Sequence, residues 1–184
     1  MPIVLCFAEA PACSTTLDPT VDLSSTSGEA GAPGGDDLAL GDCTEFGDDE
    51  TGKYAICTAP LPWEAARHDF HLRGAHLAAA ESAEENTLIA VHAAEILGQN
   101  TWLGASRDDS FLWTWETGSS FWQGGSDGTP VGDAYTRWVP GEPNNTSTVS
   151  TEQERCLALT LEGNDWNDRA CSLDLGYACE WEQE

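Results

Sequence analysis

Aromatic residues divide this chain at Cys43. All 8 Trp, all 3 Tyr and every Phe except Phe7 lie beyond that cysteine. A packed core needs such side chains, because their burial supplies much of the free energy that offsets chain ordering. We therefore predict one folded domain over residues 43–184, which is long enough to bury a core of its own.

Residues 14–42 are predicted to form a disordered acidic linker. This segment carries acidic residues but no Lys, Arg or aromatic residue, and it is rich in Ser, Thr, Gly, Pro and Ala. It cannot bury enough apolar surface to offset its ordering entropy. A flexible chain of this length reaches roughly 30 Å, so we expect a spacer.

Residues 1–13 form a short apolar stretch that ends in small residues and Cys13. The stretch resembles the remnant of a secretory signal peptide. Ala10-Pro11-Ala12-Cys13 is also similar to a bacterial lipobox, without the usual Leu, and Cys13 would then carry a lipid anchor. Both interpretations predict an extracellular protein, either secreted or held at the cell surface as a lipoprotein, and no later apolar run is long enough to span a membrane.

The net charge and the cysteine content indicate which partners and which cellular compartment are possible. The chain has 32 Asp and Glu against 7 Lys and Arg, a net charge of −25, which excludes nucleic acid as a partner. Its 7 cysteines include no CxxC pair, so we interpret them as disulfide partners formed in an oxidising compartment.

Two helices and several short strands are expected after Cys43, which makes the fold class α+β. Apolar residues at helical spacing predict a first helix between Pro62 and Gly74. A capping-box sequence at residues 82–85 begins a second helix, which ends before Gly98. The predicted strands are Lys53–Cys57, Thr101–Ala105, Phe111–Trp115, Cys156–Leu161 and Tyr177–Trp181.

A long loop rich in Gly, Ser, Asp and Asn is expected from about Ser119 to Gln153, and loops of that length are usually functional. Three oxygen-rich clusters lie in it or shortly after it, at residues 141–145, 154–156 and 166–168. Carboxylate, amide and backbone carbonyl oxygens are the ligands that Ca²⁺ selects. The predicted calcium ligands are Glu142, Asn144, Glu154, Asn167 and Asp168.

These ligands would leave room on the ion for a sugar. With the backbone carbonyl of Asp168 they supply about six oxygens, and Ca²⁺ accepts six to eight. Two neighbouring hydroxyls could then bind the ion, donate to Glu142 or Glu154, and accept from the amide groups of Asn144 or Asn167. Equatorial hydroxyls fit best, as on mannose, glucose, N-acetylglucosamine or, by equivalent geometry, fucose. One sugar should bind weakly, so a homo-oligomer or other multivalent display would supply avidity.

Residues 43–181 resemble a C-type lectin-like domain. The resemblance rests on the order and spacing of Trp63-Glu-Ala-Ala, Gly74-Ala-His-Leu77, Ser82-Ala-Glu-Glu-Asn86, Trp102-Leu-Gly104, Trp138 before Gly-Glu-Pro-Asn-Asn145, Trp166-Asn-Asp168 and Tyr177-Ala-Cys-Glu180. It implies a disulfide-stapled fold with two helices, short antiparallel sheets and a long calcium-binding loop region. In that family the triplet Glu142-Pro143-Asn144 implies mannose-type sugars, with a cis peptide bond before the proline.

The resemblance also implies the disulfide pattern. We expect Cys156–Cys171, which closes a ring worth about 3 kcal/mol, and Cys43–Cys57 as a staple of an N-terminal hairpin. The family's usual first-helix cysteine falls at Phe70, so Cys179 is either a free buried thiol beside Phe70 or paired with Cys57.

Two departures from the family pattern bear on the site. A second calcium site in some members needs acidic residues where this chain has Asn145 and Arg155, so we do not predict it. The insertion Thr146–Gln153 is longer than is common in the family, which is expected to alter access for a ligand.

Other functions are weaker hypotheses. Residues 142–145 could form only a polar surface turn, and His68 and His71 could bind zinc, although packed or solvent-facing histidines are more common. No catalytic set is evident, so we predict a binding protein and not an enzyme. The main alternative to a lectin is a calcium-stabilised scaffold of the same fold that binds a protein partner.

Overall fold

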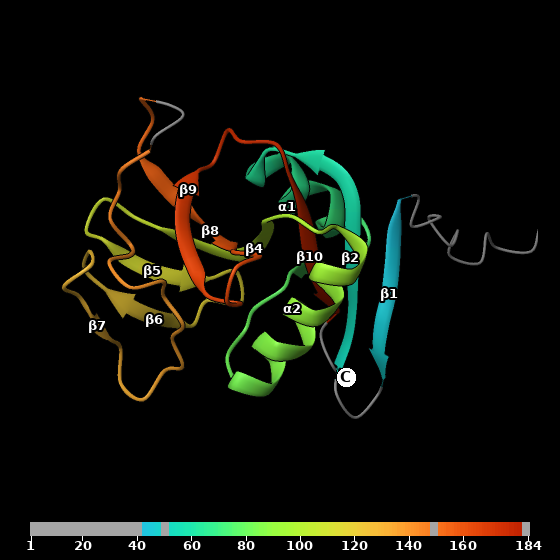
Figure 1. The fold of residues 1–184 in the computed structure, drawn as a ribbon, viewed down its shortest axis with the longest axis horizontal. Coiled ribbons are helices and arrows are strands. Elements are labelled where there is room, and N and C mark those ends of the chain that lie inside the picture. Colours follow the sequence, from blue (N-terminus) through green and yellow to red (C-terminus); the bar gives the residue numbers. More distant parts are fainter. Residues whose placement is uncertain (1–41, 49–51, 148–150, 182–184) are drawn as a thin grey trace, which may run out of the picture. The chain divides into compact units, whose positions relative to one another are not determined.

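The computed structural model describes residues 42–48, 52–147 and 151–181 (Figure 1). The predicted signal or lipobox segment 1–13 lies outside the described residues, as does the predicted linker 14–42 except for its last residue. Among the described helices, none is long and apolar enough to cross a membrane.

The described strands form one branched sheet. Its main path follows the order β1 (Cys43–Asp48), β2 (Gly52–Leu61), β10 (Leu175–Trp181), β4 (Thr101–Arg107), β5 (Leu112–Trp115), β6 (Ser120–Gln123) and β7 (Thr129–Pro130). The short β3 (His76–Leu77) pairs with β10, while β8 (Glu154–Leu159) joins β4 to β9 (Trp166–Ala170). Only the β10–β4 pairing among them is parallel; the others are antiparallel.

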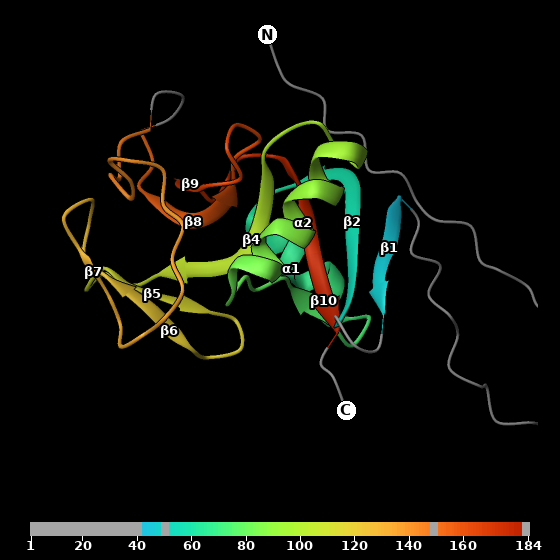
Figure 2. The same cartoon turned by 60° about the horizontal axis from the view of Figure 1, so that its bottom comes forward.

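The two predicted helices are present as α1 (Trp63–His71) and α2 (Ala83–Ile96). Pro62 precedes the first turn of α1, where its missing N–H costs nothing. The capping box of α2 is also present: the Ser82 hydroxyl accepts from the Glu85 amide and the Glu85 carboxylate accepts from the Ser82 amide, each over 3.1 Å. Figure 2 shows α2 crossing in front of β10 and β4.

A cluster of stacked aromatic rings fills the core between β5, β6 and β9. Trp115 stacks on Phe121, and both rings meet Trp166 edge-on at 5.6 Å. The indole N–H of Trp166 donates to the Asn86 side chain over 2.7 Å, and Asn86 donates to the Asn164 carbonyl over 2.9 Å. Rings of this size each bury about 150–250 Å². The cluster therefore fixes the start of β9 against α2.

The cysteine predictions that followed from the family resemblance are confirmed. Cys43 pairs with Cys57 across the β1–β2 register, and Cys156 at β8 pairs with Cys171 just after β9. Cys179 is a buried free thiol packed in the same cluster as Phe70. The alternative pairing of Cys57 with Cys179 is therefore wrong.

The expected loop from Ser119 to Gln153 contains secondary structure that the sequence did not reveal. β6 pairs with β5, and β7 pairs with β6. Both strands are short and are bounded by Gly, Ser and Asp, so their composition is that of a loop. β9 was also missed, because its buried positions include Asp168 and its hydropathy does not alternate cleanly.

Candidate functional site

The loop that carries Glu142 and Asn144 lies against β9. Trp166 donates its backbone N–H to the Arg137 carbonyl over 2.6 Å and accepts from the Val139 N–H over 2.8 Å. Trp138 also forms an isolated parallel bridge with Trp166. The predicted sugar-selecting triplet, Glu142-Pro143-Asn144, follows a few residues later, so this pairing places the triplet beside the middle of β9.

Asp168 holds the loop through its carboxylate. It is 0% exposed, and it accepts the Asn144 N–H at Oδ1 over 3.0 Å and the Asn145 N–H at Oδ2 over 2.7 Å. Two backbone donors offset part of the cost of burying this charge.

Glu142 lies beside Asp168 with one oxygen unsatisfied. Its Oε2 is buried and has no hydrogen-bond partner within the described part of the chain. The nearby carboxylate of Asp168 is itself an acceptor, so the two groups repel when both are ionised. Burial, followed by the effect of Asp168, raises the pKa of Glu142 to about 7.

Glu154 brings a third carboxylate to the same neighbourhood from the first position of β8. The residue is 2% exposed, and burial, followed by the charge of Asp168, raises the pKa of its carboxyl above the ordinary value. Among the described residues, no three Asp, Glu, His or Cys side chains are grouped tightly enough to hold a metal by themselves. Amide and carbonyl oxygens would have to complete any metal site here.

The two predicted asparagine ligands lie in different places. Asn144 is exposed at the rim, its backbone N–H bound to Asp168 and its Oδ1 accepting from the Thr146 N–H over 2.6 Å. Asn167 alternates with Asp168 along β9 and lines a separate hollow with Val139 and Thr160. The structure thus places Glu142, Asn144 and Glu154 near Asp168, and the ligand set as a whole, Asn167 included, remains a prediction.

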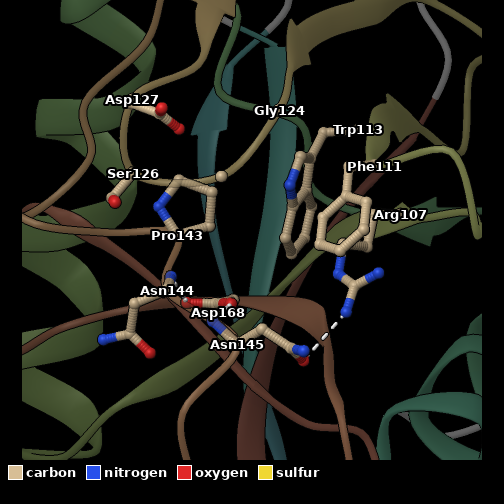
Figure 3. Close-up of a pocket in the computed structure, with 11 residues that line it drawn as sticks. Arg107, Phe111, Trp113, Gly124, Ser126, Asp127, Pro143, Asn144, Asn145 and Asp168 are labelled. Atoms are coloured by element: carbon tan, nitrogen blue, oxygen red, sulfur yellow. Dashed lines mark hydrogen bonds between the residues drawn. The ribbon is translucent and has the colours of Figure 1, made fainter.

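A pocket of about 160 Å³ opens beside this group, and we name it the loop pocket. Figure 3 places Arg107 and Phe111 on one side of it and Asn144 and Pro143 on the other. Sequence reasoning did not assign Arg107 or Asn145 to the site. Nothing in the sequence indicates that an arginine at the end of a strand is buried. Asn145 entered the sequence analysis only as the residue that stands where a second calcium site would need an acidic one.

Residues 59–181 match the family model described as the lectin C-type domain. The chain belongs to the C-type lectin domain family. Its relatives are C-type lectins, which are binding proteins, and the match does not point to a family of enzymes.

Known relatives agree with this lectin assignment. A C-type lectin of Thrasops jacksonii, one of the lectoxins, is 30% identical over 114 residues, which cover 58% of this chain and 61% of the relative. The chain thus spans less than two thirds of that relative, and only 3% of the versican core protein of Bos taurus.

Solved structures share the fold. The carbohydrate-recognition domain of the mouse scavenger receptor C-type lectin has a TM-score of 0.59 and 25% identity, covering 78% of this chain and 95% of that one. A calcium-independent type II antifreeze protein has a TM-score of 0.54 and 24% identity, covering 75% and 89% respectively. The lectin fold therefore also occurs in a protein described as independent of calcium.

Glu142→Gln should stabilise the metal-free protein at pH 8. The folded-state pKa of Glu142 lies above the ordinary value, so wild-type stability is lost as pH rises through about 7 and the carboxylate ionises beside Asp168. A neutral amide can instead donate to Asp168. We expect a thermal midpoint in EDTA about 2–4 °C higher, or ~1 kcal/mol after allowance for solvent screening.

The gain should disappear at pH 5, where the wild-type carboxyl is protonated. Glu162→Gln, in the exposed turn between β8 and β9, is the matched control and should leave the midpoint unchanged at both pH values. An unchanged or lower midpoint for Glu142→Gln at pH 8 would show that the two carboxylates do not repel.

Proposed function

We propose that this domain is a calcium-dependent lectin whose ion is held by Glu142, Asn144, Glu154, Asn167 and Asp168. The observation that carries the proposal is the buried, unpartnered Oε2 of Glu142 beside the carboxylate of Asp168. An unpartnered carboxylate oxygen that lies beside a second carboxylate is stabilised by a cation. Oxygen donors of this kind, carboxylates with amides, match the preference of Ca²⁺.

Charge balance supports one divalent ion here. Glu142, Glu154 and Asp168 carry three negative charges when ionised, and a calcium ion neutralises two of them. The remaining negative charge suits acceptance of hydrogens from ligand hydroxyls. Asn144 stands exposed at the rim, where its amide can donate to the same ligand.

The proposed ligands are glycans with equatorial vicinal hydroxyls, of the mannose, N-acetylglucosamine, glucose or fucose type. When bound, the ion would supply two coordination positions to the hydroxyl pair. Each hydroxyl would also donate to Glu142 or Glu154 and accept from an asparagine amide, so these groups would select the orientation of the hydroxyls. A pocket of about 160 Å³ offers a single sugar few contacts, so we also propose multivalent display, on a secreted protein or on a lipoprotein anchored through Cys13.

The second candidate function is a calcium-stabilised scaffold of the same fold that binds a protein partner and no sugar. The fold also occurs in an antifreeze protein, and Asn167 lies in a separate hollow; both observations favour this candidate.

A glycan array probed with the full chain in calcium and in EDTA separates the two candidates. The lectin proposal predicts signals on mannose-type glycans that vanish in EDTA and return with added calcium. An array without sugar signals in calcium favours the scaffold, and sugar signals that EDTA leaves intact contradict both candidates.

Exchanging the selecting triplet should change the preferred sugar. Glu142→Gln combined with Asn144→Asp reverses the order of acceptor and donor groups around the ion, so galactose-type sugars should gain on mannose-type sugars. Competition of each monosaccharide for an immobilised glycan measures the ratio. An unchanged ratio, with calcium still bound, would show that these residues do not select the sugar.

Acidification should release calcium and with it the sugar. Glu142, whose pKa is raised to about 7, must lose its proton before it can bind the ion. Calcium affinity should therefore fall about ten-fold for each pH unit below 7, reaching roughly 100-fold at pH 5. Calcium titration calorimetry at pH 7.5 and pH 5 checks this, and equal affinities would contradict a carboxylate-based site.

A further inference from the structure

Arg107, the last residue of β4, is a buried cation that meets three oxygens. It is 6% exposed. Its guanidinium donates from Nε to the Glu154 carbonyl over 3.0 Å, from Nη2 to Asn145 Oδ1 over 2.8 Å, and from Nη1 to the Asp108 carbonyl over 3.3 Å. A buried charge is costly unless it is hydrogen-bonded in this way, and a planar guanidinium suits several fixed acceptors at once.

The partners of Arg107 stand at the two ends of the insertion Thr146–Gln153. Asn145 directly precedes the insertion, and Glu154 directly follows it. The two ends are also joined to each other, because the Glu154 N–H donates to Asn145 Oδ1 over 2.9 Å. One guanidinium thus bonds to the residues at both ends of the insertion.

Asn145 links the contacts of Arg107 to the carboxylate of Asp168. Its backbone N–H donates to Asp168 Oδ2 over 2.7 Å, while its side chain accepts from Arg107 (Figure 3). Its backbone lies at φ +55°, in the left-handed region that asparagine tolerates better than most residues. The contacts with Arg107, Glu154 and Asp168 hold that conformation.

The ring of Phe111 packs against one face of the Arg107 guanidinium. Its ring lies 4.3 Å from the guanidinium carbon, on the loop-pocket side of Arg107. A cation over an aromatic face is attracted to it, and the ring also covers the guanidinium from solvent. The cation is therefore held on one face by an aromatic ring and at its edges by oxygens.

We propose that Arg107 is a positioning residue that pins both ends of the insertion and so prepares Glu154, Asp168 and the 142–145 loop for a cation before any metal binds. The proposal rests on the calcium site proposed above. Arg107 itself touches neither the ion nor the sugar; it acts through Asn145 and the backbone of Glu154.

The direction of the change in calcium affinity tests the proposal. Removing a positive charge close to a calcium site should by itself strengthen calcium binding. Loss of positioning should weaken it, and residues that orient metal ligands typically change affinity 10–100-fold. For Arg107→Gln in the full chain we therefore expect calcium titration calorimetry to show at least ten-fold weaker binding.

Arg155→Gln is the matched control. Arg155 neighbours Glu154 and carries the same charge, but it is half-exposed and pairs with the exposed Asp109. It should bind calcium within about two-fold of wild type. Equal or tighter calcium binding by Arg107→Gln would overturn the proposal.

Hydrogen exchange in EDTA provides a readout without metal. The amides of Asn145 and Glu154 should exchange at least ten-fold faster in Arg107→Gln than in wild type, while amides of α2 remain protected. Unchanged exchange at both amides would also overturn the proposal. If wild type binds no calcium, the proposed function fails, and this measurement still decides whether Arg107 holds the loop.

Arg107→Lys replaces Arg107→Gln in these measurements if Arg107→Gln does not fold. Lysine keeps the charge, but a single ammonium cannot replace a planar fork that reaches three separate oxygens. Exchange at Asn145 and Glu154 should again be faster than in wild type, and wild-type exchange together with wild-type calcium affinity would overturn the proposal.

Discussion

The site depends on one buried carboxylate, that of Asp168, placed in the middle of β9. Burial makes its charge costly, and the backbone N–H groups of Asn144 and Asn145 offset that cost by binding it. The same two bonds fold the loop over the strand and bring Glu142 beside Asp168. The interaction that orders the loop therefore also concentrates negative charge, which the proposed calcium ion would neutralise.

The core determines where that carboxylate lies. Trp166, two residues earlier, packs edge-on against Trp115 and Phe121 and donates to Asn86 of α2. Because β9 is anchored at its start by this aromatic cluster and close to its end by the Cys156–Cys171 disulfide, Asp168 has little freedom to move. Arg107 adds a polar anchor from β4, so the loop is held from two strands.

Sequence reasoning predicted the elements that are encoded by the spacing of apolar residues and by residues that begin or end a helix. The capping box and helical spacing located α1 and α2, and the family resemblance gave both disulfides. Strands β6, β7 and β9 were missed because their pairing is tertiary and their composition resembles a loop. For the site, residue type suggested Glu142, Glu154 and Asp168. The structure brings these carboxylates close enough for Asp168 to raise the pKa of the other two, but not into a group that could hold a metal by itself. Residue type could not show that Asn167 lines a separate hollow, or that Arg107 is buried.

A crystal structure of the full chain grown in excess calcium, with an anomalous difference map, tests the central claim most directly. The account predicts one peak at about 2.3–2.6 Å from Glu142 Oε2 and from the carboxylate of Asp168. A map without a peak between these two residues, or a peak to which Glu142 does not contribute, would contradict it.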